Sequence, residues 1–150
     1  KTDKPTPNEL RDVEKYVAIE NFLKQAYERL EPYNVSIAID VFGVMAWERD
    51  RDISVIGQRV NEMAKYVFAV CPMLYPSHFD PGFNGHKNPA DEPYHFVKEG
   101  CVRANDMVKG TDAKIIPWIQ GFTWRVKNFN ENYVLDNQSR PIRLELAPAS

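Results

Sequence analysis

The sequence lacks several features that would place it in a specialised class. Its 150 residues hold two cysteines, Cys71 and Cys101, too few for a disulfide scaffold. No run of 18 apolar residues occurs, so the sequence predicts no membrane span. The 19 basic residues are balanced by 21 acidic ones, and this net charge of −2 argues against a nucleic-acid partner.

Motifs for cofactors and metals are also missing. No glycine-rich phosphate-binding loop follows any apolar run, so neither a dinucleotide nor a P-loop nucleotide is expected. The three histidines, His78, His86 and His95, do not have the close spacing of zinc ligands. We therefore predict no cofactor and no metal.

Three short apolar runs are the clearest feature that is present. They cover residues 35–44, 66–76 and 113–122, and their β-branched composition is typical of parallel strands covered on both faces. Helical patterns separate the runs, which predicts an α/β fold of about three right-handed βα units with a parallel sheet.

The expected helices have recognisable ends. The first covers about residues 9–30 with Asn8 as its cap, a second begins after Ser54, and a third begins at Pro93 and ends before Gly110. The first helix has one apolar stripe, formed by Leu10, Val13, Val17, Phe22, Ala26 and Leu30.

The chain has room for a single domain, 1–150, because two domains of this length would have cramped cores. Residues 1–8 are expected to be a connector, and residues 137–150 a tail with no readable pattern. The first residue is Lys1 and the opening segment is too polar for a signal peptide, so either a leader has been removed or the chain is a piece of a longer protein. The loop at 75–92 is long and rich in aromatics, which favours an ordered, functional segment.

The candidate site residues lie where the apolar runs end. In parallel α/β folds the groups that act on ligands project from the carboxyl ends of strands. The first run offers Asp40, the second Tyr75 and His78, and the third Trp118 and Gln120. Aromatic platforms beside hydrogen-bonding groups suit the apolar faces and hydroxyl rims of sugars, so we predict a carbohydrate ligand.

Each of these residues also has a structural alternative. Asp40, which we expect to be desolvated by its apolar neighbours, is either a general acid/base or sugar-binding group or a structural carboxylate. His78 either contacts substrate or pins the loop, and Gln120 bonds either to substrate or to a neighbouring loop. Tyr75 and Trp118 are either stacking platforms or packing residues.

Three segments of the sequence resemble those of a known family. IAIDVFGVMAW, YVFAVCPMLYPSHF and IIPWIQGF, in this order, resemble barrel strands five, six and seven of a bacterial glycoside hydrolase family with an α-amylase-like (β/α)8 (TIM) barrel. The resemblance covers about residues 18–122, and Pro72–Phe79 is its most specific part. The family's Asp- and Arg-containing strand would come before Lys1, and the expected eighth strand ending in Trp-Asn-Pro is not found.

The resemblance implies that Asp40, Tyr75, His78, Trp118 and Gln120 line the mouth of a larger barrel. It further implies that the chain is the carboxyl-terminal part of a glycoside hydrolase acting on poly- or oligosaccharide, secreted or in the cell envelope. Without the amino-terminal half of the barrel, which is its expected partner, we predict little or no activity.

Glycoside hydrolysis normally needs two carboxyl groups, and this sequence presents one good candidate, Asp40. We expect the second on the missing strand, with Asp80 and Glu48 as more distant choices. An alternative is a non-catalytic glycan-binding or cell-envelope protein on the same scaffold. A metal-dependent hydrolase is a third alternative.

Overall fold

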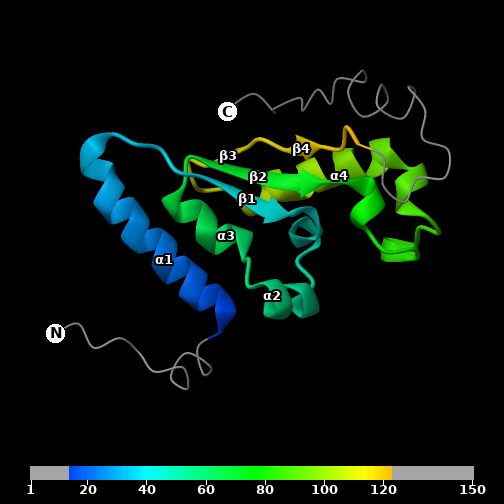
Figure 1. Ribbon diagram of the computed structural model, residues 1–150, viewed down its shortest axis with the longest axis horizontal. Coiled ribbons are helices and arrows are strands. Elements are labelled where there is room, and N and C mark those ends of the chain that lie inside the picture. The colour runs from blue at the N-terminus through cyan, green and yellow to red at the C-terminus, as the bar shows by residue number, and fades with distance from the viewer. Residues whose placement is uncertain (1–13, 123–150) are drawn as a thin grey trace.

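The computed structural model describes residues 14–122, and these residues form an α/β fold around a parallel sheet (Figure 1). Strand β1 (Ala38–Phe42) pairs with β2 (Ala69–Leu74), and β2 also pairs with two short pieces, β3 (Lys114–Ile115) and β4 (Trp118–Ile119). All pairings are parallel, which confirms the predicted alternation of helices and parallel strands.

The third apolar run forms two strand pieces, with Ile116 and Pro117 between them. Each paired residue of β3 and of β4 comes 45 residues after its partner in β2, so the two pieces continue one strand without a bulge. The Ile116 N–H donates to the Val70 carbonyl at 3.0 Å. The N–H groups of successive residues point to opposite sides of a strand. The N–H group that Pro117 lacks would therefore point away from β2, so no hydrogen bond to β2 is lost.

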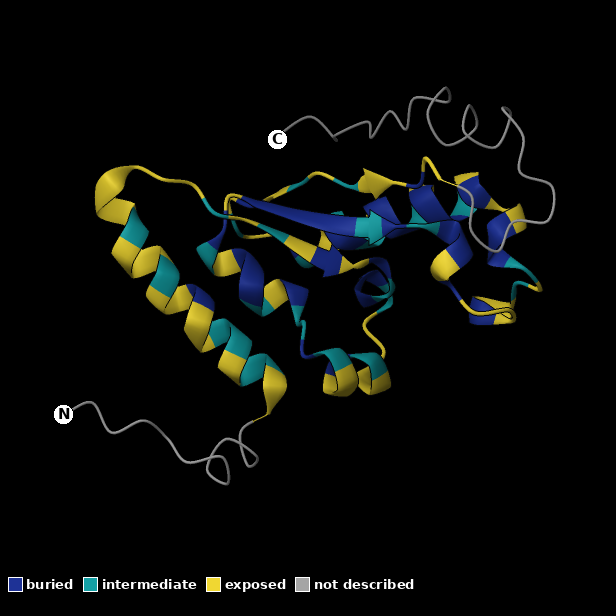
Figure 2. Ribbon diagram, in the orientation of Figure 1, coloured by how far each residue is buried: buried dark blue, intermediate teal, exposed yellow. Residues whose placement is uncertain are grey.

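The two faces of the sheet differ. Ile39 and Val41 of β1 point into the core, whereas Ala38, Asp40 and Phe42 are exposed on the opposite face, here called the open face. Exposed and less exposed residues alternate along the ribbon of β1 (Figure 2). The expectation that this strand is covered on both faces is therefore wrong. Both faces of a parallel strand are buried only where other elements pack on both sides of the sheet. By contrast, β2 is buried along nearly its whole length.

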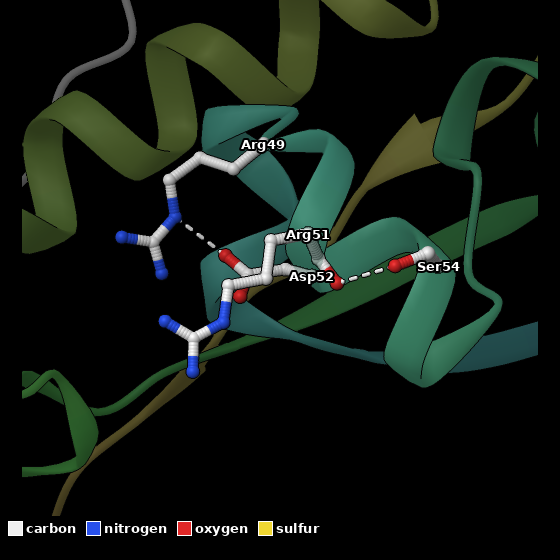
Figure 3. A network of polar contacts seen from close by, with 4 residues as sticks. All are labelled: Arg49, Arg51, Asp52 and Ser54. Carbon is white, nitrogen blue, oxygen red and sulfur yellow. Dashed lines mark hydrogen bonds and ion pairs between the residues drawn. The ribbon is translucent and has the colours of Figure 1, made fainter.

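Two short helices, α2 (Asp50–Ile56) and α3 (Val60–Met63), replace the single helix expected after Ser54. Ser54 is not a cap, because it lies inside α2 and its hydroxyl donates to the Arg51 carbonyl at 2.9 Å (Figure 3). Gly57 ends α2 with a φ of 83°, a left-handed conformation that interrupts the helical path.

The charged run at 48–52 leads into α2 and includes the first residues of this helix. Arg49 Nε donates to Asp52 Oδ2 at 2.5 Å (Figure 3), and the Arg49 side chain is about half exposed. An ion pair of this kind contributes about 0.2–1 kcal/mol. The run is therefore a mostly solvent-facing segment at the start of α2, as its composition indicates.

Helix α1 (Lys15–Leu30) packs on α2 and α3, and its buried residue is Leu23. The first part of the predicted helix, with its cap Asn8, lies outside the described residues. Phe22 was expected in the apolar stripe but is 69% exposed, so that assignment is wrong. Successive residues of a helix are rotated by about 100° around its axis, so Phe22 and Leu23 point in different directions, and Leu23 is the one that points into the core.

Helix α4 (Pro93–Met107) packs on β2, from the same side as the other helices. It starts at the proline predicted for its first turn. Val97 and Cys101 pack with Leu74, so these positions belong to the buried face of the helix. Gly100 allows this close packing, because a Cβ there would lie 2.5 Å from a Leu74 methyl carbon.

The long loop between β2 and α4 is ordered by an aromatic cluster of Trp47, Phe79, Phe83 and Phe96. Ring centroids lie 4.9 Å apart for Phe79 and Phe83, 5.1 Å for Phe79 and Phe96, and 5.3 Å for Trp47 and Phe83. The three phenylalanines are buried, which agrees with the expectation that the aromatic content orders this loop. The cluster fixes the first residues of the loop beside the end of β2.

Candidate functional site

Two predicted site residues meet on the open face, near the carboxyl ends of the strands. Asp40 is in register with Cys71, and Trp118 is in register with Met73, so both side chains project from the same face. The indole Nε1 of Trp118 donates to Oδ1 of Asp40 at 2.8 Å, reaching across β2. Trp118 remains 54% exposed. A carboxylate and an accessible indole are thus held together on the surface.

Asp40 is exposed, contrary to the expectation of a desolvated carboxylate. Its apolar neighbours in the sequence, Ile39 and Val41, pack on the opposite face of the sheet because side chains alternate along a strand. Its carboxylate is therefore accessible to a ligand from the open face.

Gln58 holds the backbone of β1 on either side of Val41, directly after Asp40. Its Oε1 accepts from the Phe42 N–H at 2.9 Å, and its Nε2 donates to the Asp40 carbonyl at 3.3 Å. Within residues 14–122 no strand pairs with this edge of β1, and the side-chain amide bonds to its backbone instead. The sequence analysis missed this residue, since a single glutamine after a helix has no recognisable pattern.

A small cavity of about 180 Å³ lies beside these residues, at the ends of β1 and β2. We call it the strand-end cavity. Its lining is mostly apolar and comprises Phe42, Gly43, Val44, Met73, Tyr75, His78 and Phe79. Two predicted site residues, Tyr75 and His78, are therefore in its wall.

Three rings pack edge to face next to this cavity. The centroids of Tyr75 and His78 lie 5.2 Å apart, those of Tyr75 and Phe122 5.2 Å, and those of His78 and Phe122 5.7 Å. Burial and the charge of Asp40 both raise the pKa of the Tyr75 phenol above its usual range. Tyr75 is consequently a neutral hydrogen-bonding group near that carboxylate at physiological pH.

Gln120 is fully buried and bonds to the loop that carries His78. Its Oε1 accepts from the Ser77 N–H at 3.2 Å and from the Ser77 hydroxyl at 2.9 Å, and its Nε2 donates to the Phe122 carbonyl at 2.9 Å. Of the two partners considered for this amide, the structure provides the neighbouring loop. A contact with substrate stays a prediction.

A larger groove, of about 600 Å³, lies at the opposite end of the sheet and contains none of the predicted site residues. Its walls include Tyr27, Asn34, Tyr66 and Thr111. Ligands of parallel α/β folds bind outside the carboxyl ends of the strands, so we place the candidate site at the strand-end cavity.

Within residues 14–122, no group of three or more His, Cys, Asp or Glu side chains is arranged to hold a metal ion. In the same part of the chain, no helix has the length and apolar character needed to cross a membrane. Cys71 and Cys101 are free thiols and both are buried. Burial, followed by the charge of Asp40, raises the pKa of the Cys71 thiol, which disfavours the reactive thiolate.

Comparison with known proteins identifies one family. No curated protein and no solved structure matches the chain significantly. Residues 2–143 match the family described as "Putative glycosyl hydrolase domain". This match supports the glycoside hydrolase part of the resemblance seen in the sequence. Because the match covers most of its length, the chain belongs to this family.

Proposed function

We propose that the chain binds a poly- or oligosaccharide at the carboxyl ends of β1, β2 and β4. The observation that carries the proposal is the bond between Trp118 Nε1 and Asp40 Oδ1 on the open face. The exposed indole offers an apolar surface for the C–H face of a sugar ring, and the carboxylate beside it accepts bonds from hydroxyl groups. Tyr75 adds a neutral phenol at the same edge.

Asp40 is our candidate for one of the two carboxyl groups of a glycosidase. Its bond with Trp118 holds the carboxylate at the edge of the indole ring, next to the face on which a bound sugar would stack. The two alternative second carboxylates considered from the sequence, Asp80 and Glu48, do not line the strand-end cavity, and Glu48 lines a different one with Asn61 and Arg103. We propose that the second carboxylate comes from outside residues 14–122.

The proposal also includes a larger barrel. In a (β/α)8 barrel the helices form an outer ring, and the opposite face of each strand points into the barrel. The helices here pack on one side of the sheet. The side chains that alternate onto the open face are the ones that would point into such a barrel. A barrel needs eight strands, so the described strands account for a sector of it, and we expect the isolated chain to be inactive in hydrolysis.

A binding experiment tests the carbohydrate proposal. We would titrate the 150-residue chain with a panel of α- and β-glucan oligosaccharides by calorimetry. At least one oligosaccharide should bind. The Trp118→Ala variant should bind it about tenfold more weakly or worse, because the variant loses the aromatic ring for stacking and the hydrogen bond that positions the Asp40 carboxylate. Tyr33→Ala is the matched control, because Tyr33 is 75% exposed on the turn after α1. Equal loss in both variants, or no binding by the wild type, would count against the proposal.

Hydrolysis is tested separately on the same panel. We expect no release of reducing sugar from the 150-residue chain. We expect activity from the protein extended by its upstream coding sequence, and its loss in the extended Asp40→Asn variant. Glycan binding without hydrolysis by the extended protein would favour the alternative, a non-catalytic glycan-binding protein on the same scaffold.

A further inference from the structure

The wall of the strand-end cavity is mostly apolar, although the cavity lies at the site proposed for a carbohydrate. Four of its side chains are apolar, namely those of Phe42, Val44, Met73 and Phe79. Phe79 is buried in the aromatic cluster and Val44 packs against that cluster, so both are held in place. A sugar hydroxyl pressed against this wall would lose its bonds to water without gaining others. The cavity therefore disfavours a substituent that is only a hydroxyl group.

The volume of the cavity suits a substituent of a sugar better than a whole oligosaccharide. It is about 180 Å³, below the roughly 300–1,000 Å³ of pockets that enclose a complete small molecule. Gly43 is part of the wall, and a Cβ there would lie 2.3 Å from the Met73 carbonyl oxygen. The ends of β1 and β2 thus meet backbone to backbone, which only glycine permits at this position.

The cavity lies next to the indole on which a sugar ring would stack. Met73 is the register partner of both Trp118 and Phe42, so all three side chains are on the open face. Neighbouring strands are about 4.8 Å apart, and the Trp118 indole crosses β2 to reach Asp40. A ring stacked on the indole therefore has one edge within reach of the cavity.

We propose that the strand-end cavity is a subsite for the acetyl group of an N-acetylated sugar. The methyl of this group is buried against Phe42, Val44 and Met73, and its carbonyl oxygen accepts a hydrogen bond. The phenol of Tyr75, whose pKa is raised by burial and by the charge of Asp40, keeps its proton and is a donor in the same wall. The inference rests on the proposed function and deepens it, because it names glycans of N-acetylhexosamine as the substrate class.

A free amino group at the same position of the sugar does not suit the cavity. Within residues 14–122, no Asp, Glu, Lys or Arg side chain lines it. An ammonium group placed there would be desolvated without a partner, which is unfavourable. The deacetylated sugar is therefore the sharpest comparison.

Calorimetry of the 150-residue chain with matched tetrasaccharides tests this preference. The probes are β-1,4-linked tetramers of N-acetylglucosamine, glucose and glucosamine, which differ only in the substituent at carbon 2. We expect the N-acetylglucosamine tetramer to bind about tenfold more tightly than the glucose tetramer. Burial of one methyl group accounts for about fourfold, and the hydrogen bond to the carbonyl for the rest. The glucosamine tetramer should bind no more tightly than the glucose tetramer, and tighter binding would show that the charge of Asp40 selects the substituent instead of the cavity.

Variants of the wall test the cause. Phe42→Ala removes one side of the cavity from a residue that is 52% exposed, so the core stays intact. Val44→Thr keeps the shape of the wall and adds a hydroxyl group to it. Each should reduce the preference for the N-acetylated tetramer to about threefold or less. The matched controls, Phe22→Ala and Val55→Thr, change exposed residues outside the cavity and should leave the preference unchanged. An unchanged preference in both cavity variants overturns the proposal.

Methyl NMR locates the acetyl group. In the chain labelled with ¹³C at the methionine methyl groups, the Met73 signal is assigned with Met73→Leu. The N-acetylglucosamine tetramer should shift this signal and leave that of Met63, which lies in the core, unmoved. A bound tetramer that leaves the Met73 signal unmoved contradicts the subsite.

The outcomes separate this inference from the proposed function. If the N-acetylglucosamine and glucose tetramers bind equally, the subsite fails and carbohydrate binding stands. If the N-acetylated tetramer shifts the Met73 signal but binds Trp118→Ala as tightly as the wild type, the subsite stands and the stacking on Trp118 fails. If no oligosaccharide binds at all, both fail.

Discussion

Replacing Phe83 with alanine tests whether the aromatic cluster orders the loop beside the candidate site. Phe83 is 6% exposed, and its ring lies 4.9 Å from Phe79 and 5.3 Å from Trp47, measured between centroids. The guanidinium of Arg49 lies 4.4 Å from its ring centroid. Truncation removes all of these contacts at once and leaves a hole under the loop.

The expected cost follows from burial. A fully buried Phe→Ala change costs about 3–5 kcal/mol, and a loop that collapses into the hole recovers part of it. We therefore expect a loss of about 3 kcal/mol in the free energy of unfolding, and a midpoint of thermal unfolding lowered by about 10 °C. Because the loop carries His78, carbohydrate affinity should fall as well.

Urea unfolding followed by circular dichroism measures this loss. Phe22→Ala is the matched control, since it removes the same side chain from a position that is 69% exposed. The control should change the free energy of unfolding by less than about 0.5 kcal/mol. Equal losses for Phe83→Ala and Phe22→Ala would refute the packing described for both residues, and faster proteolysis at 79–92 in Phe83→Ala alone would support it.

Three further predictions concern other parts of the fold. Gly57→Ala should lower the free energy of unfolding by about 1–3 kcal/mol in urea, because φ is 83° and the new Cβ would lie 2.6 Å from Lys15 Cβ. Gln58→Ala removes two bonds to β1 and should cost about 1–3 kcal/mol, with faster hydrogen exchange at the Phe42 amide. Burial raises the pKa of Cys101 to about 11 from an ordinary value of 9.0, so the neutral thiol favours the folded state below pH 9 and this stabilisation is lost as the pH rises toward 11. The free energy of unfolding should therefore fall more steeply between pH 9 and 11 in the wild type than in Cys101→Ala; parallel pH profiles would contradict this.

The strands were predictable because continuous apolar runs have few other uses at this length. All three runs form strands, although β1 and β2 are shorter than their runs. The predictions of which side chains point into the core were wrong at two positions. Periodicity selected Phe22 where the core uses Leu23, and an apolar setting suggested a desolvated Asp40 where strand alternation exposes it. In both cases the side that is covered depends on tertiary packing, which local spacing does not contain.

The site was predictable only as a set of residues at strand ends. That Asp40 and Trp118 touch depends on two strand registers and a separation of 78 residues, and no local pattern encodes either. Gln58 had no signal, since it acts through two bonds to partners 16 and 18 residues away along the chain. Aromatics and polar groups at strand ends mark where a site lies, and the fold decides which of them meet.

The central claim is that carbohydrate binds on the open face at Trp118 and Asp40. The most direct measurement follows the indole N–H signals of the ¹⁵N-labelled chain during titration with an oligosaccharide from the glucan panel, the Trp118 signal being assigned with Trp118→Phe. We predict a saturable shift of the Trp118 signal and an unchanged signal for Trp47, whose ring lies in the aromatic cluster. Binding that leaves the Trp118 signal unmoved would contradict the site.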